Sequence, residues 1–186
     1  MNVLDRLLRD WRISKAVACI PDDVRVLDIG SHDGALFRSL GTRLRDGVGL
    51  DPDLPSDIVR PAYCLLRAAF PEGYEGEPGS FDAVTALAVI EHIPLDRQAT
   101  FASAIGEVLR EGGLVVITVP SPKVDRFLDV AMKVRLLHGM EVGQHYGFDV
   151  ERLVPLFRNA GFDPVRHDRF QLGLNNLFVF RKRGRS

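Results

Sequence analysis

The sequence is short of the residues and patterns that mark several protein classes. Only two of its 186 residues are cysteines, Cys19 and Cys64, and without metal-ligand spacing they predict neither a disulfide scaffold nor a metal site. No apolar run approaches the roughly 20 residues that span a bilayer. The formal net charge is −1, without the basic excess typical of nucleic-acid-binding proteins. These absences favour a cytoplasmic protein with no membrane span, no metal and no nucleic-acid partner.

The remaining composition is that of an ordinary globular domain. Hydrophobic residues make up 46% of the chain and charged residues 26%, which at this length suits one domain, 1–186, with its own core. Residues 1–20 place Leu7, Leu8 and Trp11 at helical spacing, so a leading amphipathic helix is expected to cover one face of the domain. We expect the protein to be a monomer or a homodimer.

The stretch from Val24 to Gly34 organises the rest of the prediction. An apolar run that contains Asp28 is followed by two glycines four positions apart, Gly30 and Gly34. The branched residues predict a strand buried on both faces, and the glycines permit backbone conformations that a side chain would block. A helix is expected over 35–40. A strand, a glycine turn and a helix N-terminus in this order predict a corner that binds a nucleotide-type ligand.

The alternation of strands and helices continues along the chain. The run 48–50 is a second strand that ends in an acid, Asp51, 21 residues after Gly30, an interval that fits one strand-helix-strand unit. Five prolines between 52 and 80 argue against a long helix there. Further strands are expected at 63–67, 81–88 and 114–119, helices at 97–110, 124–137 and 149–160, and a closing strand pair at 164–170 and 177–181. This order indicates an α/β fold with a parallel sheet and helices on both faces.

Three helix boundaries are predicted from individual residues. Gly112 and Gly113 are expected to end the helix over 97–110. Asp149 is expected to cap the helix that runs to Ala160, and Gly161 to end it.

Three motifs resemble those of the class I S-adenosylmethionine-dependent methyltransferases. They are Val-Leu-Asp-Ile-Gly-Ser-His-Asp-Gly at 26–34, Gly-Leu-Asp-Pro at 49–52, and Phe-Asp-Ala-Val-Thr-Ala-Leu-Ala-Val-Ile-Glu-His-Ile-Pro at 81–94. The resemblance implies a three-layer α/β sandwich with a seven-stranded, mostly parallel sheet and an antiparallel last strand. It also implies transfer of a methyl group from S-adenosylmethionine to a small-molecule acceptor, with S-adenosylhomocysteine as the product.

The resemblance also assigns residues to the cofactor. Gly30 and Gly34 would shape the loop beneath the methionine part, and Asp28 would organise its amino group. Asp51 would accept hydrogen bonds from both ribose hydroxyls, which suits an ionised carboxylate because it only accepts hydrogen bonds. The other cofactor-binding candidates are Ser31, His32, Pro52, Ala69, Phe70, Ala86, Leu87 and Ala88.

Two of these positions depart from the family pattern. His32 stands where the family usually has a glycine, and Ala69 stands where an acidic residue often holds the adenine amino group. A backbone N–H near Ala69 or Phe70 could still serve the adenine ring. The departures leave open a methyltransferase-like module that binds without catalysis. A nicotinamide-dependent oxidoreductase is a further alternative, disfavoured because Gly-x-Gly-x-x-Gly is missing.

Two of the five histidines are candidates for a catalytic base. Methyl transfer needs a base only when the acceptor must lose a proton, and histidine is suited to this near neutral pH. His145 lies in a polar, glycine-flanked turn, and His92 belongs to a Glu-His pair common in the family. The segment 121–148 is expected to form a lid over an apolar or mixed acceptor.

Overall fold

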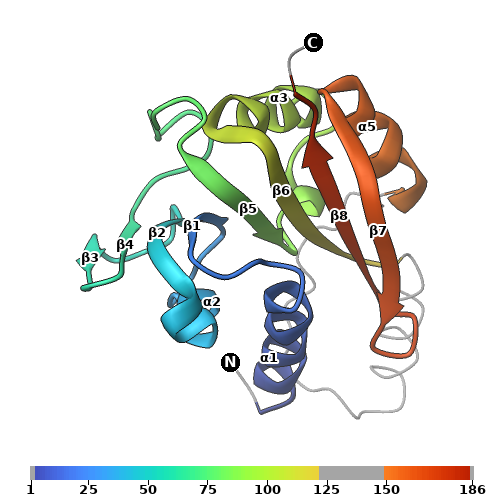
Figure 1. Ribbon diagram of the computed structural model, residues 1–186. Coiled ribbons are helices and arrows are strands. Elements are labelled where there is room, and N and C mark those ends of the chain that lie inside the picture. The colour runs from blue at the N-terminus through green and yellow to red at the C-terminus, as the bar shows by residue number, and fades with distance from the viewer. Residues whose placement is uncertain (1–2, 122–148, 185–186) are drawn as a thin grey trace.

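The computed structural model describes residues 3–121 and 149–184, without the side chains of residues 3–5. Within these residues, eight strands form one sheet in the order β3-β4-β2-β1-β5-β6-β8-β7 (Figure 1). Strands β1, β2, β4, β5 and β6 run parallel, whereas β8 is antiparallel to both β6 and β7. The strands are β1 (Val24–Ile29), β2 (Leu44–Leu50), β3 (Ile58–Val59), β4 (Tyr63–Leu66), β5 (Phe81–Leu87), β6 (Leu109–Pro120), β7 (Phe162–Phe170) and β8 (Asn175–Lys182).

The α/β class, the mostly parallel sheet and its antiparallel last strand are confirmed. The described sheet has one strand more than the seven expected, because Ile58 and Val59 pair antiparallel with β4 at the sheet edge. Two residues are too few for an alternating pattern to be visible in a sequence. The other strands in the predicted ranges are present, and several extend beyond them: β2 begins at Leu44 and β7 at Phe162.

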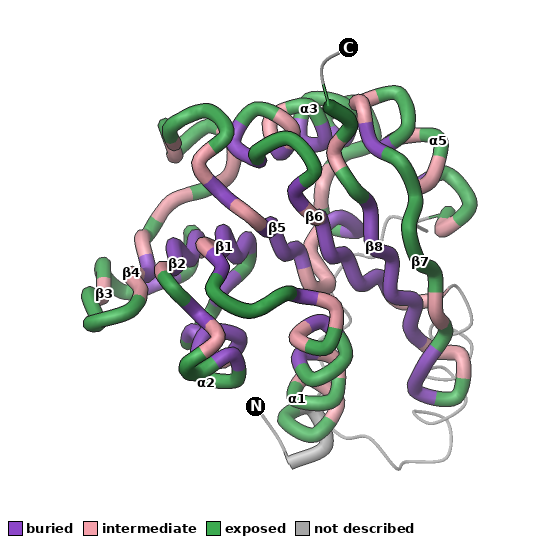
Figure 2. The backbone as a smooth tube through the Cα atoms, in the orientation of Figure 1, coloured by how far each residue is buried: buried purple, intermediate pink, exposed green. Residues whose placement is uncertain are grey.

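Helices cover both faces of the sheet. Helices α1 (Val3–Val17) and α2 (Ala35–Leu40) lie on one face, where Ile13 and Phe37 pack against strand residues such as Val26. Helices α3 (Gln98–Val108) and α5 (Leu153–Asn159) lie on the other, where Phe101 and Phe157 belong to a second core cluster. Strands β1, β5, β6 and β8 are therefore buried along most of their length (Figure 2). Short 3-10 turns complete the described elements: η1 (Gly41–Arg43), η2 (Ile90–His92) and η3 (Val150–Arg152).

The predicted end of the helix over 97–110 is wrong. Helix α3 ends at Val108, and strand β6 begins at once with Leu109. Phe81 pairs with Leu109 while Ala83 pairs with Leu114, so the residues between them bulge out of the ladder. Gly112 has φ +71°, and a Cβ on Gly113 would lie 2.7 Å from Leu109. The two glycines therefore serve a bulge, which sequence reasoning took for a helix end.

The remaining boundary predictions are confirmed where the structure describes them. No helix occurs in the proline-rich segment 52–80. The Asp149 carboxylate accepts a hydrogen bond from Glu151 N at 3.0 Å and caps η3, which continues into α5. The helix expected over 124–137 lies outside the described residues.

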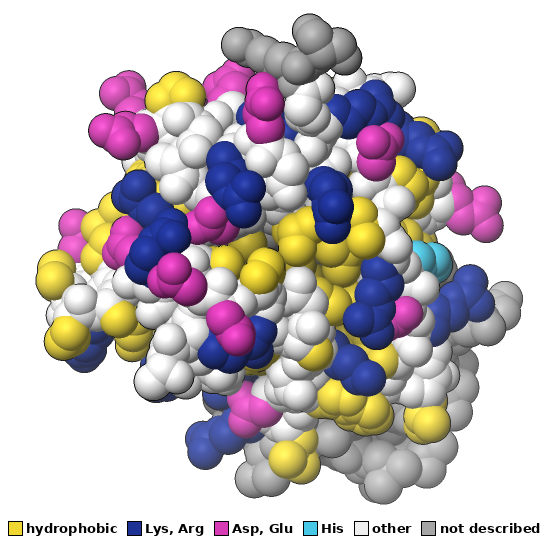
Figure 3. Space-filling view, in the orientation of Figure 1, with side chains coloured by type: hydrophobic (Ala, Val, Ile, Leu, Met, Phe, Trp, Pro, Cys, Tyr) yellow, Lys and Arg dark blue, Asp and Glu magenta, His cyan; other side chains and the backbone are white. Residues whose placement is uncertain are grey.

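The outer surface carries mixed charge. Basic and acidic side chains alternate over the face seen in Figure 3. Among the described residues, none of the helices combines the length and apolar character needed to cross a membrane.

Asp82 ties together the beginnings of the central strands. Its carboxylate accepts hydrogen bonds from Arg25 N at 2.8 Å, from Arg110 Nε at 2.6 Å and from Arg45 at 2.7 Å. Arg25 lies on β1, Arg45 on β2 and Arg110 on β6. Burial alone would raise the pKa of Asp82, but these hydrogen bonds and the two arginine charges outweigh it and lower the pKa. One acid thus fixes the bulged start of β6 against its neighbours.

We expect Asp82→Ala to destabilise the protein by about 2 kcal/mol at pH 7, because three charge-assisted hydrogen bonds are lost. Since the folded state lowers the pKa of Asp82, this contribution is complete above the ordinary Asp pKa of about 3.9 and disappears as the pH falls below it. Urea unfolding at pH 7 and pH 3 measures the difference. Asp163→Ala is the control, because Asp163 only makes an exposed ion pair with Arg183. Equal effects of the two variants at pH 7 would contradict the role given to Asp82.

Candidate functional site

The loop after β1 is held against the end of β2. The N–H groups of Gly30 and Ser31 both donate to the Leu50 carbonyl oxygen, at 2.8 and 3.1 Å. Gly30 has φ +76°, and a Cβ there would lie 2.6 Å from Val89 Cγ2. Gly34, with φ +73°, precedes the first residue of α2. Both glycines therefore adopt the left-handed conformation that the sequence prediction required of this turn.

The His32 side chain points out of this loop. The exposed fraction of the side chain is 73%, and its Nδ1 lies 3.8 Å from Asp33 Oδ1. The backbone of His32 has φ +47°, a conformation that glycine adopts without strain. Its N–H donates to Asp51 Oδ2 at 2.9 Å. The residue therefore keeps a backbone geometry that suits glycine, and most of its ring is exposed to solvent.

Asp51 follows β2 and faces the same loop. Its other oxygen, Oδ1, accepts from Asp53 N at 3.0 Å, so both oxygens are fixed by backbone donors. A carboxylate has about four lone-pair sites, which leaves each oxygen able to accept a further hydrogen bond. The carboxylate is thus oriented in advance for a ligand with two donors.

Asp28 is buried at the end of β1. It is 4% exposed, and the Thr85 hydroxyl donates to its Oδ1 at 2.6 Å. Burial raises the pKa of Asp28 to about 7; the hydrogen bond from Thr85 opposes this rise, and the nearby charge of Asp51 adds to it. A cation close to this buried carboxyl group would stabilise its charged form and lower its pKa.

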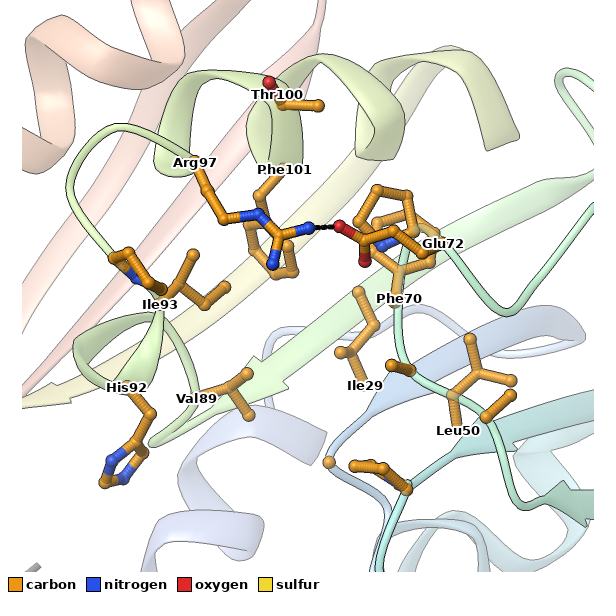
Figure 4. Close-up of a pocket in the computed structure, with 16 residues that line it drawn as sticks. Ile29, Leu50, Phe70, Glu72, Val89, His92, Ile93, Arg97, Thr100 and Phe101 are labelled. Atoms are coloured by element: carbon orange, nitrogen blue, oxygen red, sulfur yellow. Dashed lines mark ion pairs between the residues drawn. The ribbon is translucent and has the colours of Figure 1, made fainter.

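A cavity of about 360 Å³ opens beside Gly30 at the carboxyl ends of the strands. Figure 4 shows the side chains around it, which come from β1, β2, the loop after β4, the loop after β5 and α3. Most are apolar, and the predicted residues Gly30, Pro52, Ala69, Phe70 and His92 line it. Its size and lining are typical of a site for a small organic ligand.

A smaller cavity of about 60 Å³ lies on the other side of the loop, between the loop and α1. Asp28, Gly30, Ser31, Arg12 and Leu87 line it. Ser31 Oγ and Arg12 Nε are buried here without a hydrogen-bond partner. Because Gly30 lines both cavities, they flank one stretch of backbone.

Arg12 faces a second buried acid, Glu91, in η2. Glu91 is 2% exposed, and its Oε2 has no hydrogen-bond partner. Burial raises the pKa of Glu91 to about 7. A hydrogen bond from its own backbone N–H and the charge of Arg12 both act to lower the pKa, but burial outweighs them. Burial likewise lowers the pKa of Arg12, and Glu91 opposes the change. Sequence reasoning missed Arg12 and did not include Glu91 among the site residues; the available signals were a charge amid the apolar stripe of α1 and the Glu-His pair itself.

A family model described as a methyltransferase domain matches residues 4–167. The chain belongs to this family of methyltransferase domains. The resemblance found in the three motifs is thereby confirmed.

Individual relatives agree with this assignment. The ubiquinone biosynthesis O-methyltransferase of Dechloromonas aromatica is 27% identical over 128 residues, which are 63% of this chain and 52% of that protein. The chain thus spans about half the length of this relative. The structure of magnesium protoporphyrin IX methyltransferase from Synechocystis with bound S-adenosylhomocysteine gives a TM-score of 0.70 at 14% identity, over 98% of this chain and 88% of that one.

A second solved structure has the same fold. It is the 1,6-didemethyltoxoflavin-N1-methyltransferase of Burkholderia thailandensis, with 1,6-didemethyltoxoflavin and S-adenosylhomocysteine bound. The TM-score is 0.67 at 17% identity, over 93% of this chain and 77% of that one.

Most of the predicted site residues lie at one edge of the methyltransferase domain. Four line neither cavity, namely Gly34, Asp51, Ala86 and Ala88. Ala86 is fully buried in the core, and Ala88, with φ +58°, donates its N–H to the Thr118 carbonyl oxygen. His145 lies outside the described residues. Within the described part of the domain, no group of three or more His, Cys, Asp or Glu residues is placed to hold a metal ion.

Asp28→Asn should stabilise the ligand-free domain at pH 8 by about 2 to 4 kcal/mol. The folded state raises the pKa of Asp28 to about 7, so the native protein keeps a proton that the unfolded chain releases above about pH 4. Stability therefore falls as the pH rises from 4 to 7, and an amide avoids the loss. Urea unfolding at pH 4.5 and pH 8 should show the gain mainly at pH 8.

Asp33→Asn is the matched control, because Asp33 is an exposed acid of the same loop whose pKa is lowered by Arg38 despite partial burial. It should give no gain at pH 8. A gain for Asp28→Asn that is the same at both pH values would contradict the buried charge as its cause.

Proposed function

We propose that the protein transfers a methyl group from S-adenosylmethionine to a small-molecule acceptor and releases S-adenosylhomocysteine. The observation that carries the proposal is the pair of cavities that share Gly30, one apolar and about 360 Å³, the other small and lined by Asp28 and Arg12. S-adenosylmethionine has a flat aromatic end and a zwitterionic end. The three relatives described above carry the same activity in their names, each toward a small organic molecule.

Asp51 is proposed to bind the ribose. Its chain neighbours Leu50 and Pro52 line the larger cavity, and its Oδ2 accepts from the N–H of His32, a residue that lines the smaller one. Each carboxylate oxygen retains an acceptor site beside its backbone hydrogen bond. Two acceptor oxygens suit the two hydroxyls of the sugar and disfavour a phosphate in their place.

Asp28, Ser31 and Arg12 are proposed to bind the amino-acid end. The orphaned Ser31 Oγ and Arg12 Nε are buried polar atoms that lack a protein partner, and such atoms are costly unless something pairs with them. A carboxylate suits Arg12, and an ammonium group suits Asp28. The ammonium charge would return the pKa of Asp28 toward its ordinary range.

The chain's own task in the transfer is positioning. When bound, S-adenosylmethionine supplies a methyl carbon activated by the adjacent sulfonium. Gly30, Asp28 and Asp51 would fix the position of that carbon, and alignment alone lowers the barrier of an in-line displacement. His92, which lines the larger cavity, and His145 are the proposed bases for an acceptor that must lose a proton.

The cytoplasm is the proposed location. Both cysteines of the chain, Cys19 and Cys64, are free thiols, as expected in a reducing compartment.

Calorimetry with S-adenosylmethionine and S-adenosylhomocysteine tests the proposal. We expect binding of both and methyl transfer to at least one phenol, amine or carbon acid of a small-molecule panel. Asp51→Ala should weaken binding by roughly 10- to 100-fold, because hydrogen bonds to a charged group are lost. Asp53→Ala, which removes an exposed acid two residues away, should not. Absence of binding at millimolar concentration would refute the proposal, and binding without turnover would support a non-catalytic module instead.

Arg12→Gln tests the amino-acid end separately. Binding of S-adenosylhomocysteine should fall by roughly 10- to 100-fold through loss of a charge-assisted contact. Binding of 5′-methylthioadenosine, which lacks the amino and carboxylate groups, should be unchanged. Arg6→Gln, on the exposed side of the same helix, is the control. If Arg12→Gln weakens both ligands equally, Arg12 stabilises the fold and does not contact the ligand.

A further inference from the structure

A bulge in β7 turns two polar side chains toward the side of the sheet that α5 covers. The register of β7 against β8 shifts between Pro164 and Arg166, so Val165 is an extra residue in the ladder. Because side chains alternate along a strand, one extra residue reverses the face of every residue that follows it. His167 and Arg169 consequently share a cavity with residues of α5. Bulges that re-aim side chains are frequent next to active sites.

This cavity has a volume of about 480 Å³ and lies between the β7–β8 ribbon and the segment that contains η3 and the start of α5. We refer to it as the ribbon cavity. Ser121, the residue after β6, lines it, so it opens where the parallel strands end. Val154 of the ribbon cavity packs against the same core cluster as Val89, which lines the cavity beside Gly30. Both cavities therefore lie on one face and at one edge of the sheet.

Asn176 and Arg169 place hydrogen-bond donors side by side in the ribbon cavity. They are direct partners across the β7–β8 ladder. Asn176 is 3% exposed, and its Oδ1 lies 3.1 Å from Nε2 of His167, whose ring stacks on Phe178 at a centroid distance of 4.0 Å. Because an amide oxygen only accepts, His167 donates to it and leaves the amide N–H groups for another partner. Within the described residues, neither these N–H groups nor the Arg169 guanidinium has a partner.

Two neighbouring donors, one of them charged, suit a carboxylate. A carboxylate only accepts hydrogen bonds, and a guanidinium beside an amide can engage both of its oxygens. Asp149 and Glu151 line the opposite wall, where their charges oppose an anion and confine it to the ribbon side. The rest of an organic acid held here would lie against the apolar side chains of Phe178, Val150 and Val154.

We propose that Arg169 and Asn176 bind a carboxylate group of the methyl acceptor, so that the substrate of this protein is an organic acid. The inference rests on the proposed function, because it takes the ligand of the ribbon cavity to be the acceptor. The carboxylate anchors one end of the acceptor, and its reacting atom lies toward the cavity beside Gly30. This adds one anionic group to the apolar or mixed acceptor expected from the sequence.

Calorimetry with 4-hydroxybenzoate and 4-hydroxybenzamide tests the inference, because the two probes share a shape and differ in charge. The protein saturated with S-adenosylhomocysteine should bind the acid roughly 10- to 100-fold more tightly than the amide, through charge-assisted hydrogen bonds. Arg169→Gln should reduce this ratio to less than about 3-fold, because the charged donor is lost. Asn176→Asp keeps the shape of the side chain but replaces its donors by an acceptor, so it should reduce the ratio as well.

Arg166→Gln is the matched control. Arg166 belongs to the same strand but pairs with Asp168 and does not line the ribbon cavity, so the ratio should stay at its wild-type value. Thermal unfolding of each variant verifies the fold. In the acceptor panel described above, the compounds that are methylated should carry a carboxylate.

Three results would overturn the inference while leaving the proposed function intact. They are a wild-type ratio near one or no binding of the acid at millimolar concentration, an equal ratio in Arg169→Gln and the wild type, and methyl transfer confined to acceptors without an acid group. Failure of the wild-type protein to bind S-adenosylhomocysteine in the same samples would overturn the proposed function and the inference together.

Discussion

The structure depends on the hydrogen bonds that join the loop after β1 to the end of β2. Two successive N–H groups, those of Gly30 and Ser31, share the Leu50 carbonyl oxygen, and the next one, that of His32, reaches Asp51. This run is possible only where Gly30 takes a left-handed conformation and approaches Val89 closely. Both cavities lie against this stretch of backbone. The position of any ligand is consequently set by main-chain geometry, with side chains adding selectivity at either end.

Much of this arrangement follows from local sequence. The strand over Val24–Ile29, its glycines and Asp51 could be predicted because each depends on a short pattern and a fixed spacing. The bulge before Gly113 could not, since it arises only from the pairing of β5 with β6. The outward turn of His32 was equally invisible, because a residue type does not disclose a positive φ. At the bulge, strand pairing overrode the local signal, whereas for His32 the sequence offered no local signal.

The missed charges have a common origin. Arg12 and Glu91 come from α1 and η2, far apart in the chain, and meet only when the helix covers the sheet. No spacing rule links such residues, so only the fold reveals them. Functional sites bring together polar groups that have no hydrogen-bond partner within the fold. Rules based on sequence are expected to fail at such sites.

The buried Asp28 carboxylate has a consequence for the protein in the cell. Without a neighbouring cation it opposes folding near neutral pH, because burial holds its pKa near 7. A ligand that supplies the cation binds the native state alone and stabilises it in proportion to the logarithm of its concentration. The abundance of the folded protein should therefore follow the supply of such a ligand.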